Sequence, residues 1–320
     1  MSYKKVDDLK TLSIVTPSYN QGQFIEETIR SVLFQKGHFY IDYIIMDGSS
    51  QDNSVDIIKK YEHLLRENCR ILEKDGLKYY TKIKDDFQWN RCRGISYRWK
   101  SEKDNGQVHA LKKGFKLAKG DIYSWLNSDD IYINAGVLHK VCNYFNEDPS
   151  LELLSGDGPF ISRTGEEMKL HHVDRIDLKE LLYLDYHILQ PSSFFHKNIY
   201  RENLLDEKFT CAFDADFFIG LLYKGVNYKK VNDRLAAFRL YKETKTLTSI
   251  KTRCNEQIQI ARKYSDNRFS LAVSTIYRKV QRIYETWFKK KKPFVWFWII
   301  IRRICYKLIT GRWKSGVIER

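Results

Sequence analysis

Four polar side chains follow an apolar run near the middle of the chain without a spacer. Residues 122–126 (IYSWL) are rich in β-formers and indicate a buried strand. The side chains after it are Asn127, Ser128, Asp129 and Asp130. Adjacent carboxylates at the carboxyl end of a strand in an open α/β sheet can hold Mg²⁺ or Mn²⁺, which fills its other positions with water and substrate phosphate. They can also cap the following helix, and this segment alone leaves both interpretations open.

A second acidic pair opens an apolar segment later in the chain. Asp214 and Asp216 lie in the run FDADFFIGLL, which predicts a helix that is buried on all sides. Carboxylates in the first turn of a helix are stabilised by the helix dipole. They are also the side chains that general base catalysis uses. The segment by itself leaves the structural and the catalytic role equally open.

Two strand–helix units precede the central run and would build the sheet that positions it. They pair a strand at 12–17 with a helix at 24–33, and a strand at 43–46, closed by Asp47, with a helix at about 53–65. Ser50 or Asp52 can cap the second helix. Consecutive strand–helix units favour a parallel sheet. The sequence therefore predicts an α/β fold with the polar side chains at the carboxyl edge of a mostly parallel sheet.

The remaining segments predict further elements around this sheet. These are a strand at 95–100, a helix at 108–117 with Gly120 as its C′ residue, a helix capped by Asn134, a strand at 151–157, a hairpin around residues 164 and 165, and a strand at 236–241. Residues 66–94 mix charged and aromatic side chains without a clear period. We expect either an insertion near the binding edge or a plain surface excursion there.

Composition excludes several classes of protein. A hydrophobic content of 43% over 320 residues excludes wholesale disorder and allows one large domain or two modest ones. The six cysteines are scattered, without the spacing of a zinc site, and we expect them to be reduced. The amino-terminal residues lack the apolar stretch of a signal peptide, so the expected location is cytoplasmic.

Most of the positive charge lies in the carboxyl-terminal tail. Residues 269–320 hold thirteen Lys or Arg against two Glu, a net charge of +11 within the +15 of the whole chain. Apolar residues of 271–290 fall on one helical stripe, and the run at 294–301 is too short to span a membrane. Basic and aromatic residues on an amphipathic helix predict an element that lies on an anionic membrane surface. The alternative is a helical hairpin packed on the protein or a partner subunit, and no recognised module accompanies the charge to favour nucleic acid.

Four motifs in this order resemble the inverting glycosyltransferases of the family 2 type, which have the GT-A fold. The resemblance runs from about residue 12 to residue 247. The motifs are TPSYNQGQFIEETIRSVLFQ, IIMDGSSQDNS, SEKDNGQVHALKKGFKLAKGDIYSWLNSDD, and QPSSFF followed by FDADFF. The resemblance implies a metal-assisted transferase that moves a sugar from a nucleotide-diphosphate sugar to a hydroxyl, with inversion in one displacement.

The resemblance also implies a role for individual residues. Asp214 would be the catalytic base, with Asp216 and Gln190 in support on the acceptor side. Asp47 would accept the imide N–H that uracil, thymine and guanine share. Asp129 would bind the metal, and Asp130 is an adjacent ligand. The other residues expected at the donor nucleotide are Thr16, Ser18, Tyr19, Asp104, Asn127 and Ser128, of which Asn127 replaces the first acid of the family's DxD motif.

The sequence thus predicts a GT-A domain at 1–250 and a basic amphipathic helical extension at 251–320. We expect a transferase that uses Mg²⁺ or Mn²⁺, with a UDP-sugar as the first choice of donor and a lipid-linked or polysaccharide precursor as acceptor. It would lie on the inner face of the cell membrane and bind no nucleic acid. One alternative is a binding or scaffold protein that keeps the fold without turnover. Another, a nucleotidyltransferase, would be expected to carry a basic triphosphate loop after the first strand, and TPSYNQGQ has no Lys or Arg.

Overall fold

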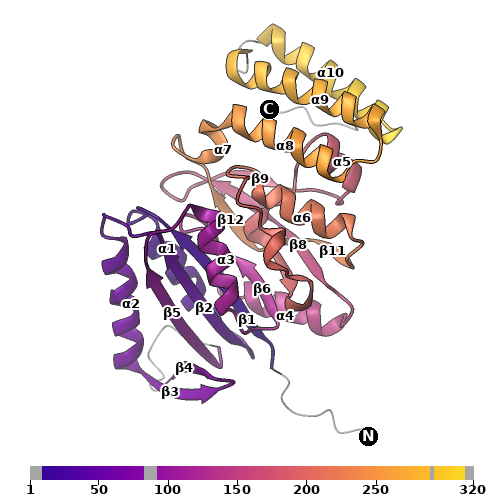
Figure 1. Ribbon diagram of the computed structural model, residues 1–320. Coiled ribbons are helices and arrows are strands. Elements are labelled where there is room, and N and C mark those ends of the chain that lie inside the picture. The colour runs from indigo at the N-terminus through magenta and orange to yellow at the C-terminus, as the bar shows by residue number, and fades with distance from the viewer. Residues whose placement is uncertain (1–8, 83–91, 289–291, 314–320) are drawn as a thin grey trace, which may run out of the picture. The chain divides into compact units, whose positions relative to one another are not determined.

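The computed structural model describes residues 9–82, 92–288 and 292–313 (Figure 1). The chain folds into two compact units that alternate along the sequence. The first comprises residues 1–172, 189–202 and 227–240, and the second comprises residues 173–188, 203–226 and 241–320. The KDDFQWN segment and all but the last residue of the basic segment KKKK fall outside the described residues.

The first unit is built on a twelve-strand mixed sheet, counted over the described residues. Its centre consists of four parallel strands in the order β5, β2, β1 and β6. Their bounds are Thr11–Ser18 for β1, Tyr40–Asp47 for β2, Gly94–Ser101 for β5 and Ile122–Trp125 for β6. All eight residues of β1 are buried, as expected for a parallel strand that is covered on both faces. The predicted parallel α/β sheet is confirmed.

Four helices accompany these strands, and each was predicted. They are α1 (Ile25–Leu33), α2 (Ser54–Asn68), α3 (Gln107–Leu117) and α4 (Val137–Glu147). Their apolar positions recur at helical spacing, and the residues at those positions are buried in the core of the unit. One core cluster lies between α1, α2, α4 and the central strands, and α3 packs on β1 and β2.

Part of the segment that the sequence left undecided forms a hairpin at the edge of the sheet. Strands β3 (Cys69–Lys74) and β4 (Leu77–Lys82) pair antiparallel, and β4 also pairs with β5. The turn between them is Asp75-Gly76, with φ of 52° and 70°. Positive φ at both central residues is the condition for a tight two-residue hairpin turn. The Asp-Gly pair was therefore a local signal for this hairpin.

Two predicted helix boundaries are wrong. Gly120 is not a C′ residue, because α3 ends at Leu117 and Ala118 is its extended C-cap. A Cβ at Gly120 would lie 2.6 Å from the carbonyl oxygen of Thr11, so close approach to β1 explains the glycine. Asn134 does not cap α4 directly. Its side chain accepts a hydrogen bond from the backbone N–H of Gly136 (2.8 Å), one residue before the helix begins.

The second half of the sheet surrounds strand β8. The predicted strand at 151–157 is longer than expected, and β8 forms the predicted hairpin with β9 across Gly165. The predicted strand at 236–241 is confirmed as β12, whereas β10 and β11 were not predicted. The bounds are β7 Ile131–Tyr132, β8 Leu153–Ile161, β9 Glu167–His171, β10 Ser193–His196, β11 Tyr228–Arg234 and β12 Ala236–Arg239.

The second unit is helical. Helices α5 and α6, which the sequence placed in the domain at 1–250, pack on the carboxyl-terminal helices α8 and α9. This unit therefore gathers residues from both sides of the boundary predicted at residue 250. The bounds are α5 Leu178–Tyr183, α6 Phe213–Tyr223, α7 Lys245–Thr248, α8 Ile250–Tyr264, α9 Arg268–Ile283, a π-helical turn η4 Tyr284–Phe288 and α10 Lys292–Thr310. None of the helices in the described parts of the chain has both the length and the apolar character that crossing a bilayer requires.

Candidate functional site

The polar residues predicted in the first unit lie at one edge of its sheet. In the strand register, Ser18 at the end of β1 pairs with Asp47 at the end of β2, and Asp47 pairs with Ser101 at the end of β5. Strand β6 ends beside β1, because Val15 pairs with Trp125. The carboxyl ends of these parallel strands therefore meet at the edge where open α/β sheets bind ligands.

Asp47 is a buried carboxylate that organises this edge. Its side chain accepts hydrogen bonds from the backbone N–H of Ser50 (2.9 Å), from the Ser50 hydroxyl (2.5 Å) and from the Ser101 hydroxyl (2.7 Å). These donors stabilise the buried carboxylate and fix its orientation. Sequence reasoning missed the role of Ser101, because its contact with Asp47 spans 54 positions.

The loops after β1 and β2 are joined to each other. Asn20 and Ser49 both adopt positive φ (51° and 63°). The backbone N–H of Asn20 donates to the Ser50 hydroxyl, and the Asn20 side-chain oxygen accepts from the backbone N–H of Gln51, each at 2.8 Å. Tyr19, next to this junction, leaves 60% of its surface exposed. The edge therefore presents an aromatic ring on a fixed backbone.

Asp104 approaches Tyr19 and Asp47 at this edge. A Cβ at Gly48 would lie 2.8 Å from the Asp104 Oδ2 and 3.3 Å from the Tyr19 Cδ2, so the glycine permits both side chains to approach the backbone. The other oxygen, Oδ1, accepts from the backbone N–H of Gly106 (2.8 Å), which fixes the direction of the carboxylate. Three of the predicted donor residues, Tyr19, Asp47 and Asp104, are thus brought together.

Asn127 is the centre of a hydrogen-bonded group at the end of β6. Its amide oxygen accepts from the Gln107 Nε2 (2.7 Å), and its amide nitrogen donates to the Asp130 Oδ2 (3.1 Å) and the Gln190 Oε1 (3.2 Å). Gln190 also donates to the Trp125 carbonyl (2.7 Å). An amide can donate and accept at once, which a carboxylate in this position could not do. Gln107 was not predicted.

Asp130 is turned into the protein. Its carboxyl group is buried and accepts from the backbone N–H of Arg239 (2.9 Å) and from Asn127. Burial, followed by the neighbouring Asp129 carboxylate, raises the pKa of Asp130 well above its usual range. Both contacts direct the Asp130 carboxyl group into the protein. Its role as a metal ligand remains a prediction.

Arg239 is a buried residue that sequence reasoning missed. Its guanidinium donates to the carbonyl oxygens of Asp129 (2.9 Å), Ser162 (3.2 Å) and Arg163 (3.0 Å), and it forms an ion pair with Glu27. The chain thereby fixes the backbone of the NSDD turn from a strand more than 100 positions later. Only its place in an expected strand was visible in the sequence.

Asp129 is the partly exposed carboxylate of the predicted pair. Within the described residues, no group of three or more His, Cys, Asp or Glu side chains is arranged to hold a metal ion. A hard cation that takes most of its ligands from water and substrate phosphate does not need such a group. Asp129 at the carboxyl edge fits a cation held in that way.

Three further predicted donor residues lie at or near the strand ends. Thr16 is buried within β1, and its hydroxyl is 3.3 Å from the Tyr43 hydroxyl. Ser18, at the end of the strand, is buried, and its hydroxyl oxygen has no hydrogen-bond partner among the described residues. Ser128 is also buried. A buried hydroxyl without a partner is costly. Ser18 lies at the ligand-binding edge, where a bound ligand would supply the missing hydrogen-bond partner.

The second unit carries Asp214, the second residue of α6, as part of a partly buried turn. Burial raises the pKa of its carboxyl group to about 6, and its own backbone N–H and that of Ala215 oppose this shift. The pKa of Tyr186 in the same unit is raised well above its usual range, first by burial and then by the Asp214 carboxylate. A carboxylate with a pKa close to neutrality is suited to general base catalysis.

Asp216 lies two residues further along α6 and has a different environment. It is fully buried, and its two carboxylate oxygens accept from the Lys263 ammonium at 2.9 and 2.8 Å. Burial raises the pKa of Asp216, and the ion pair with Lys263 opposes the rise. This contact attaches α6 to α8. A supporting role on the acceptor side remains a prediction.

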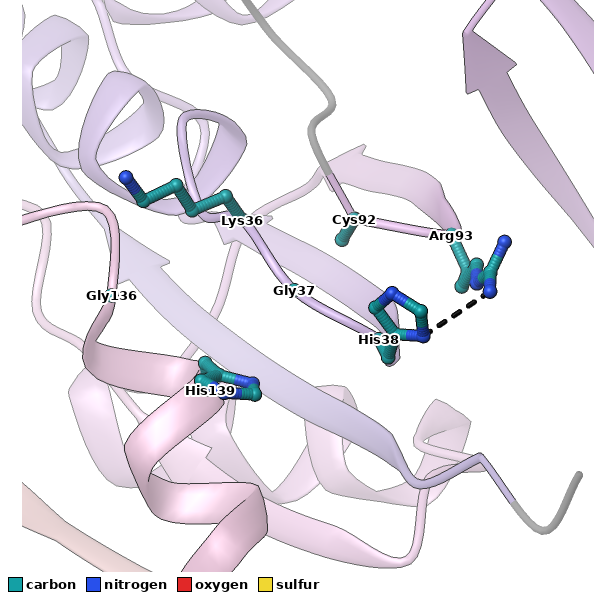
Figure 2. A pocket seen from close by; sticks show the side chains of 7 residues that line it. All are labelled: Lys36, Gly37, His38, Cys92, Arg93, Gly136 and His139. Carbon is teal, nitrogen blue, oxygen red and sulfur yellow. Dashed lines mark hydrogen bonds between the residues drawn. The ribbon is translucent and has the colours of Figure 1, made fainter.

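A hollow of about 470 Å³ in the first unit lies away from the residues described above. Figure 2 shows its lining, in which Arg93 donates to the His38 Nδ1 (3.2 Å) and His139 lies on the other side of the Gly37 backbone. Its residues precede β2 and β5 or lie at the start of α4, so the hollow belongs to the amino ends of these strands. None of the predicted site residues lines this hollow.

Comparison with known proteins identifies relatives for most of the chain. Residues 13–215 match the family model described as Glycosyl transferase family 2. A protein of Methanocaldococcus jannaschii, described as an uncharacterized glycosyltransferase, is 21% identical over 248 residues, which cover 76% of each chain.

Two solved structures share the fold. Residues 1–349 of S. aureus TarS, in complex with UDP-GlcNAc, align with a TM-score of 0.52 and 14% identity over 94% of this chain and 82% of that chain. A mannosyltransferase from Pyrobaculum calidifontis, in complex with GDP-Man and Mn²⁺, aligns with a TM-score of 0.52 and 12% identity over 97% of this chain and 77% of that chain. At these identities the likeness establishes the fold alone.

Proposed function

The chain belongs to the glycosyl transferase family 2 and is a transferase with a GT-A-type fold, and from this premise we propose that it transfers a sugar from a nucleotide-diphosphate sugar to a hydroxyl group with inversion. The observation that carries the proposal is the meeting of Tyr19, Asp47 and Asp104 at the carboxyl edge of the sheet. An aromatic ring beside two carboxylates provides a stacking surface and hydrogen-bond acceptors, which a nucleobase and a ribose require.

The donor would bind along this edge. The ring of Tyr19 would stack on the base, and Asp47 would accept the imide N–H of the base, because two donors from Ser50 and one from Ser101 leave part of its acceptor capacity. Asp104 would accept from the ribose hydroxyls. We take uracil as the first choice of base, and the TarS neighbour was solved with UDP-GlcNAc.

A divalent cation, Mg²⁺ or Mn²⁺, would neutralise the diphosphate as it leaves. Asp129 would hold it, while Asp130 and Arg239 fix the turn that carries Asp129. The mannosyltransferase neighbour was solved with Mn²⁺. Asn127 would contact the donor without contributing a charge, because its side chain is an amide. That amide also joins Gln107 to Gln190.

Asp214 would be the general base. Its carboxylate would remove the proton of the acceptor hydroxyl as the hydroxyl oxygen attacks the anomeric carbon and the nucleoside diphosphate departs from the opposite face. The raised pKa of Asp214, about 6, supports this role because a base near neutrality combines the deprotonated state with proton affinity.

Nucleotide binding tests the donor site. Thermal unfolding would be followed with a panel of nucleoside diphosphates, with and without Mn²⁺, for the wild type and for Asp129→Asn. A ligand at 100 times its dissociation constant adds about 2.7 kcal/mol of stability. One nucleotide should stabilise the wild type with Mn²⁺ and stabilise Asp129→Asn far less. Stabilisation of neither protein by any nucleotide would contradict the proposed donor site.

The carboxyl-terminal helices would bind the protein to an anionic membrane surface, such as the inner leaflet of the cell membrane. Large apolar side chains are exposed along both helices, seven residues apart on α9 and mostly three or four apart on α10, so that each helix carries an apolar stripe. On α9 they are Phe269, Ile276 and Ile283, and on α10 they are Phe294, Trp296, Phe297, Ile300, Ile304 and Leu308. Lys279, Arg303 and Lys307 are also exposed on these helices. An apolar face with cationic borders suits the membrane interface. A lipid-linked or polysaccharide precursor at that surface would then be the acceptor.

Vesicle flotation tests this surface. The double variant Phe297→Glu/Ile304→Glu should lose most of its binding to vesicles that contain phosphatidylglycerol. The matched control Ile71→Glu/Met168→Glu changes equally exposed apolar residues of the first unit (58% and 61% exposed) and should float like the wild type. Equal flotation of both double variants would contradict the assignment.

A further inference from the structure

The amino-terminal end of α6 has no cap of its own. Its N-cap residue is Ala212, whose side chain has no oxygen to accept a hydrogen bond. The backbone N–H groups at a helix start have no partner within the helix, and an uncapped buried start is costly. Asp214 is only two positions beyond this cap, so the direction of its carboxylate depends on how the helix start is held.

Glu256 of α8 accepts from the N-cap N–H of Ala212 and from the two residues that precede the cap. Its Oε1 accepts from the backbone N–H (2.8 Å) and the hydroxyl (3.0 Å) of Thr210. Its Oε2 accepts from the backbone N–H groups of Cys211 (2.9 Å) and Ala212 (2.7 Å). Both oxygens are therefore used, and each receives two donors. Glu256 is 5% exposed, so solvent has almost no part in these contacts.

This arrangement has the chemistry of a specific anchor. A buried carboxylate is expensive unless it is fully hydrogen-bonded, and hydrogen bonds to a charged acceptor are about twice as strong as neutral ones. Three consecutive backbone N–H groups that converge on one carboxylate fix the path of the chain immediately before α6. Residue 256 also lies beyond residue 215, where the match to the family model ends.

We propose that Glu256 is a positioning residue, which holds the start of α6 so that Asp214 presents its carboxylate in the reactive direction. The inference rests on the proposed role of Asp214 as the base. Glu256 need not touch the substrate in this role. The helix α8, which the sequence assigned to a carboxyl-terminal extension, thereby becomes part of the catalytic machinery.

The charges around Asp214 predict how its titration responds. The Arg253 guanidinium of α8 lowers the pKa of Asp214, the Glu256 carboxylate raises it, and the Tyr186 hydroxyl lies beside it. Replacement of Glu256 by Gln removes one negative charge and leaves Arg253 in place. The pKa of Asp214 should then fall, and the acidic limb of the profile of kcat/KM against pH should move to lower pH.

The experiment compares Glu256→Gln with a matched carboxylate-to-amide change at Asp266, in the connection between α8 and α9. Asp266→Asn removes the charge of the carboxylate that accepts from the Tyr223 hydroxyl (3.1 Å), a contact that is exposed to solvent. Thr210→Val is a milder variant, because it removes only the side-chain donor to Glu256. Release of nucleoside diphosphate from the sugar donor gives the kinetics, and amide hydrogen exchange reports on residues 210–212 directly.

Glu256→Gln should lower kcat by about tenfold to a hundredfold, the order expected for a displacement of about 1 Å, with the donor KM nearly unchanged. Amide exchange at 210–212 should accelerate, the acidic limb should shift as described, and Asp266→Asn should behave like the wild type. Thr210→Val should show the loss of kcat and the faster amide exchange at smaller size and no shift of the acidic limb, because the Glu256 charge is retained; this keeps the test valid if Glu256→Gln fails to fold.

Two results would overturn the inference, and they are distinguishable. If Asp214→Asn keeps full turnover, the proposed base is wrong and there is no base for Glu256 to position, whatever the exchange rates are. If Asp214→Asn is inactive while folded Glu256→Gln keeps its kcat and its pH profile, the proposed base stands and only the role of Glu256 is refuted.

Discussion

Replacement of Arg239 by Met should loosen the turn that carries Asp129 while the sheet remains folded. The guanidinium of Arg239 is almost fully buried and donates to the carbonyl oxygens of Asp129, Ser162 and Arg163. Met fills a similar volume but donates no hydrogen bond. The backbone N–H of residue 239, which Asp130 accepts, is retained. The substitution therefore isolates the side-chain anchor.

The expected size follows from burial. Removal of one partner from a buried ion pair costs about 3–5 kcal/mol. Glu27, the anionic partner, leaves 54% of its side chain exposed and can recover water, so the lower end applies. We expect the local free energy of opening around residues 122–133 to fall by about 3 kcal/mol, which is more than a hundredfold in the opening equilibrium.

Hydrogen exchange followed by mass spectrometry measures this quantity in a peptide that covers the turn. Arg234→Met is the matched control, because Arg234 also pairs with a glutamate, Glu167, but both side chains are largely exposed (42% and 50%). An exposed pair contributes about 0–1 kcal/mol, so the control should exchange nearly like the wild type. Metal-dependent binding of the nucleotide should weaken by about tenfold in Arg239→Met alone, a cost of about 1.4 kcal/mol.

Equal exchange in Arg239→Met and Arg234→Met would refute the reasoning. It would mean that the buried guanidinium does not hold the turn, whatever its distances suggest. Faster exchange with unchanged nucleotide binding would refute the link between the turn and the donor site.

Three further predictions concern single positions. Burial raises the pKa of Asp214 to about 6, so the charged carboxylate destabilises the folded state. This destabilisation grows as the pH rises from the ordinary pKa of an aspartate through about 6. Asp214→Asn should therefore unfold at a higher temperature than the wild type at pH 8 and at the same temperature near pH 3. Arg278 is buried, and its Nε and Nη2 have no acceptor among the described residues. Arg278→Met should therefore leave the temperature of thermal unfolding unchanged or raise it. Arg302→Met breaks an ion pair and should lower that temperature. Gly48→Ala would place a Cβ 2.8 Å from Asp104, so calorimetry should show weaker nucleotide binding in a variant with an unchanged far-ultraviolet circular dichroism spectrum.

The predicted strands and helices of the first unit were accessible from the sequence because their signals are local. Apolar runs marked β1, β2 and β6, and their polar endings marked the ligand-binding edge. Even the missed β3–β4 hairpin had a local signal in Asp75-Gly76. Where one glycine had two possible explanations, as at Gly120, the sequence alone favoured the wrong one, because close approach to β1 is a tertiary contact.

The residues that hold the candidate site were not accessible in this way. Arg239 reaches the NSDD turn from 110 positions away, and Glu256 reaches the start of α6 from 44 to 46 positions away. Neither residue belongs to a local pattern, since a buried charge looks the same in sequence as an exposed one. The sequence also could not distinguish Asp129 from Asp130. Asp129 is partly exposed and Asp130 is buried, and this difference arises only from the fold of the turn.

Turnover of a nucleotide sugar would show directly whether the chain is a metal-assisted sugar transferase. Release of nucleoside diphosphate would be followed for a panel of nucleotide sugars, with and without Mn²⁺, using the wild type and Asp129→Asn. Loss of the metal's charge stabilisation costs several kcal/mol. We predict metal-dependent turnover of nucleotide sugars with one base by the wild type, and a loss of about a hundredfold or more in Asp129→Asn. Turnover by Asp129→Asn at the wild-type rate, or turnover of no nucleotide sugar by the wild type, would contradict the account.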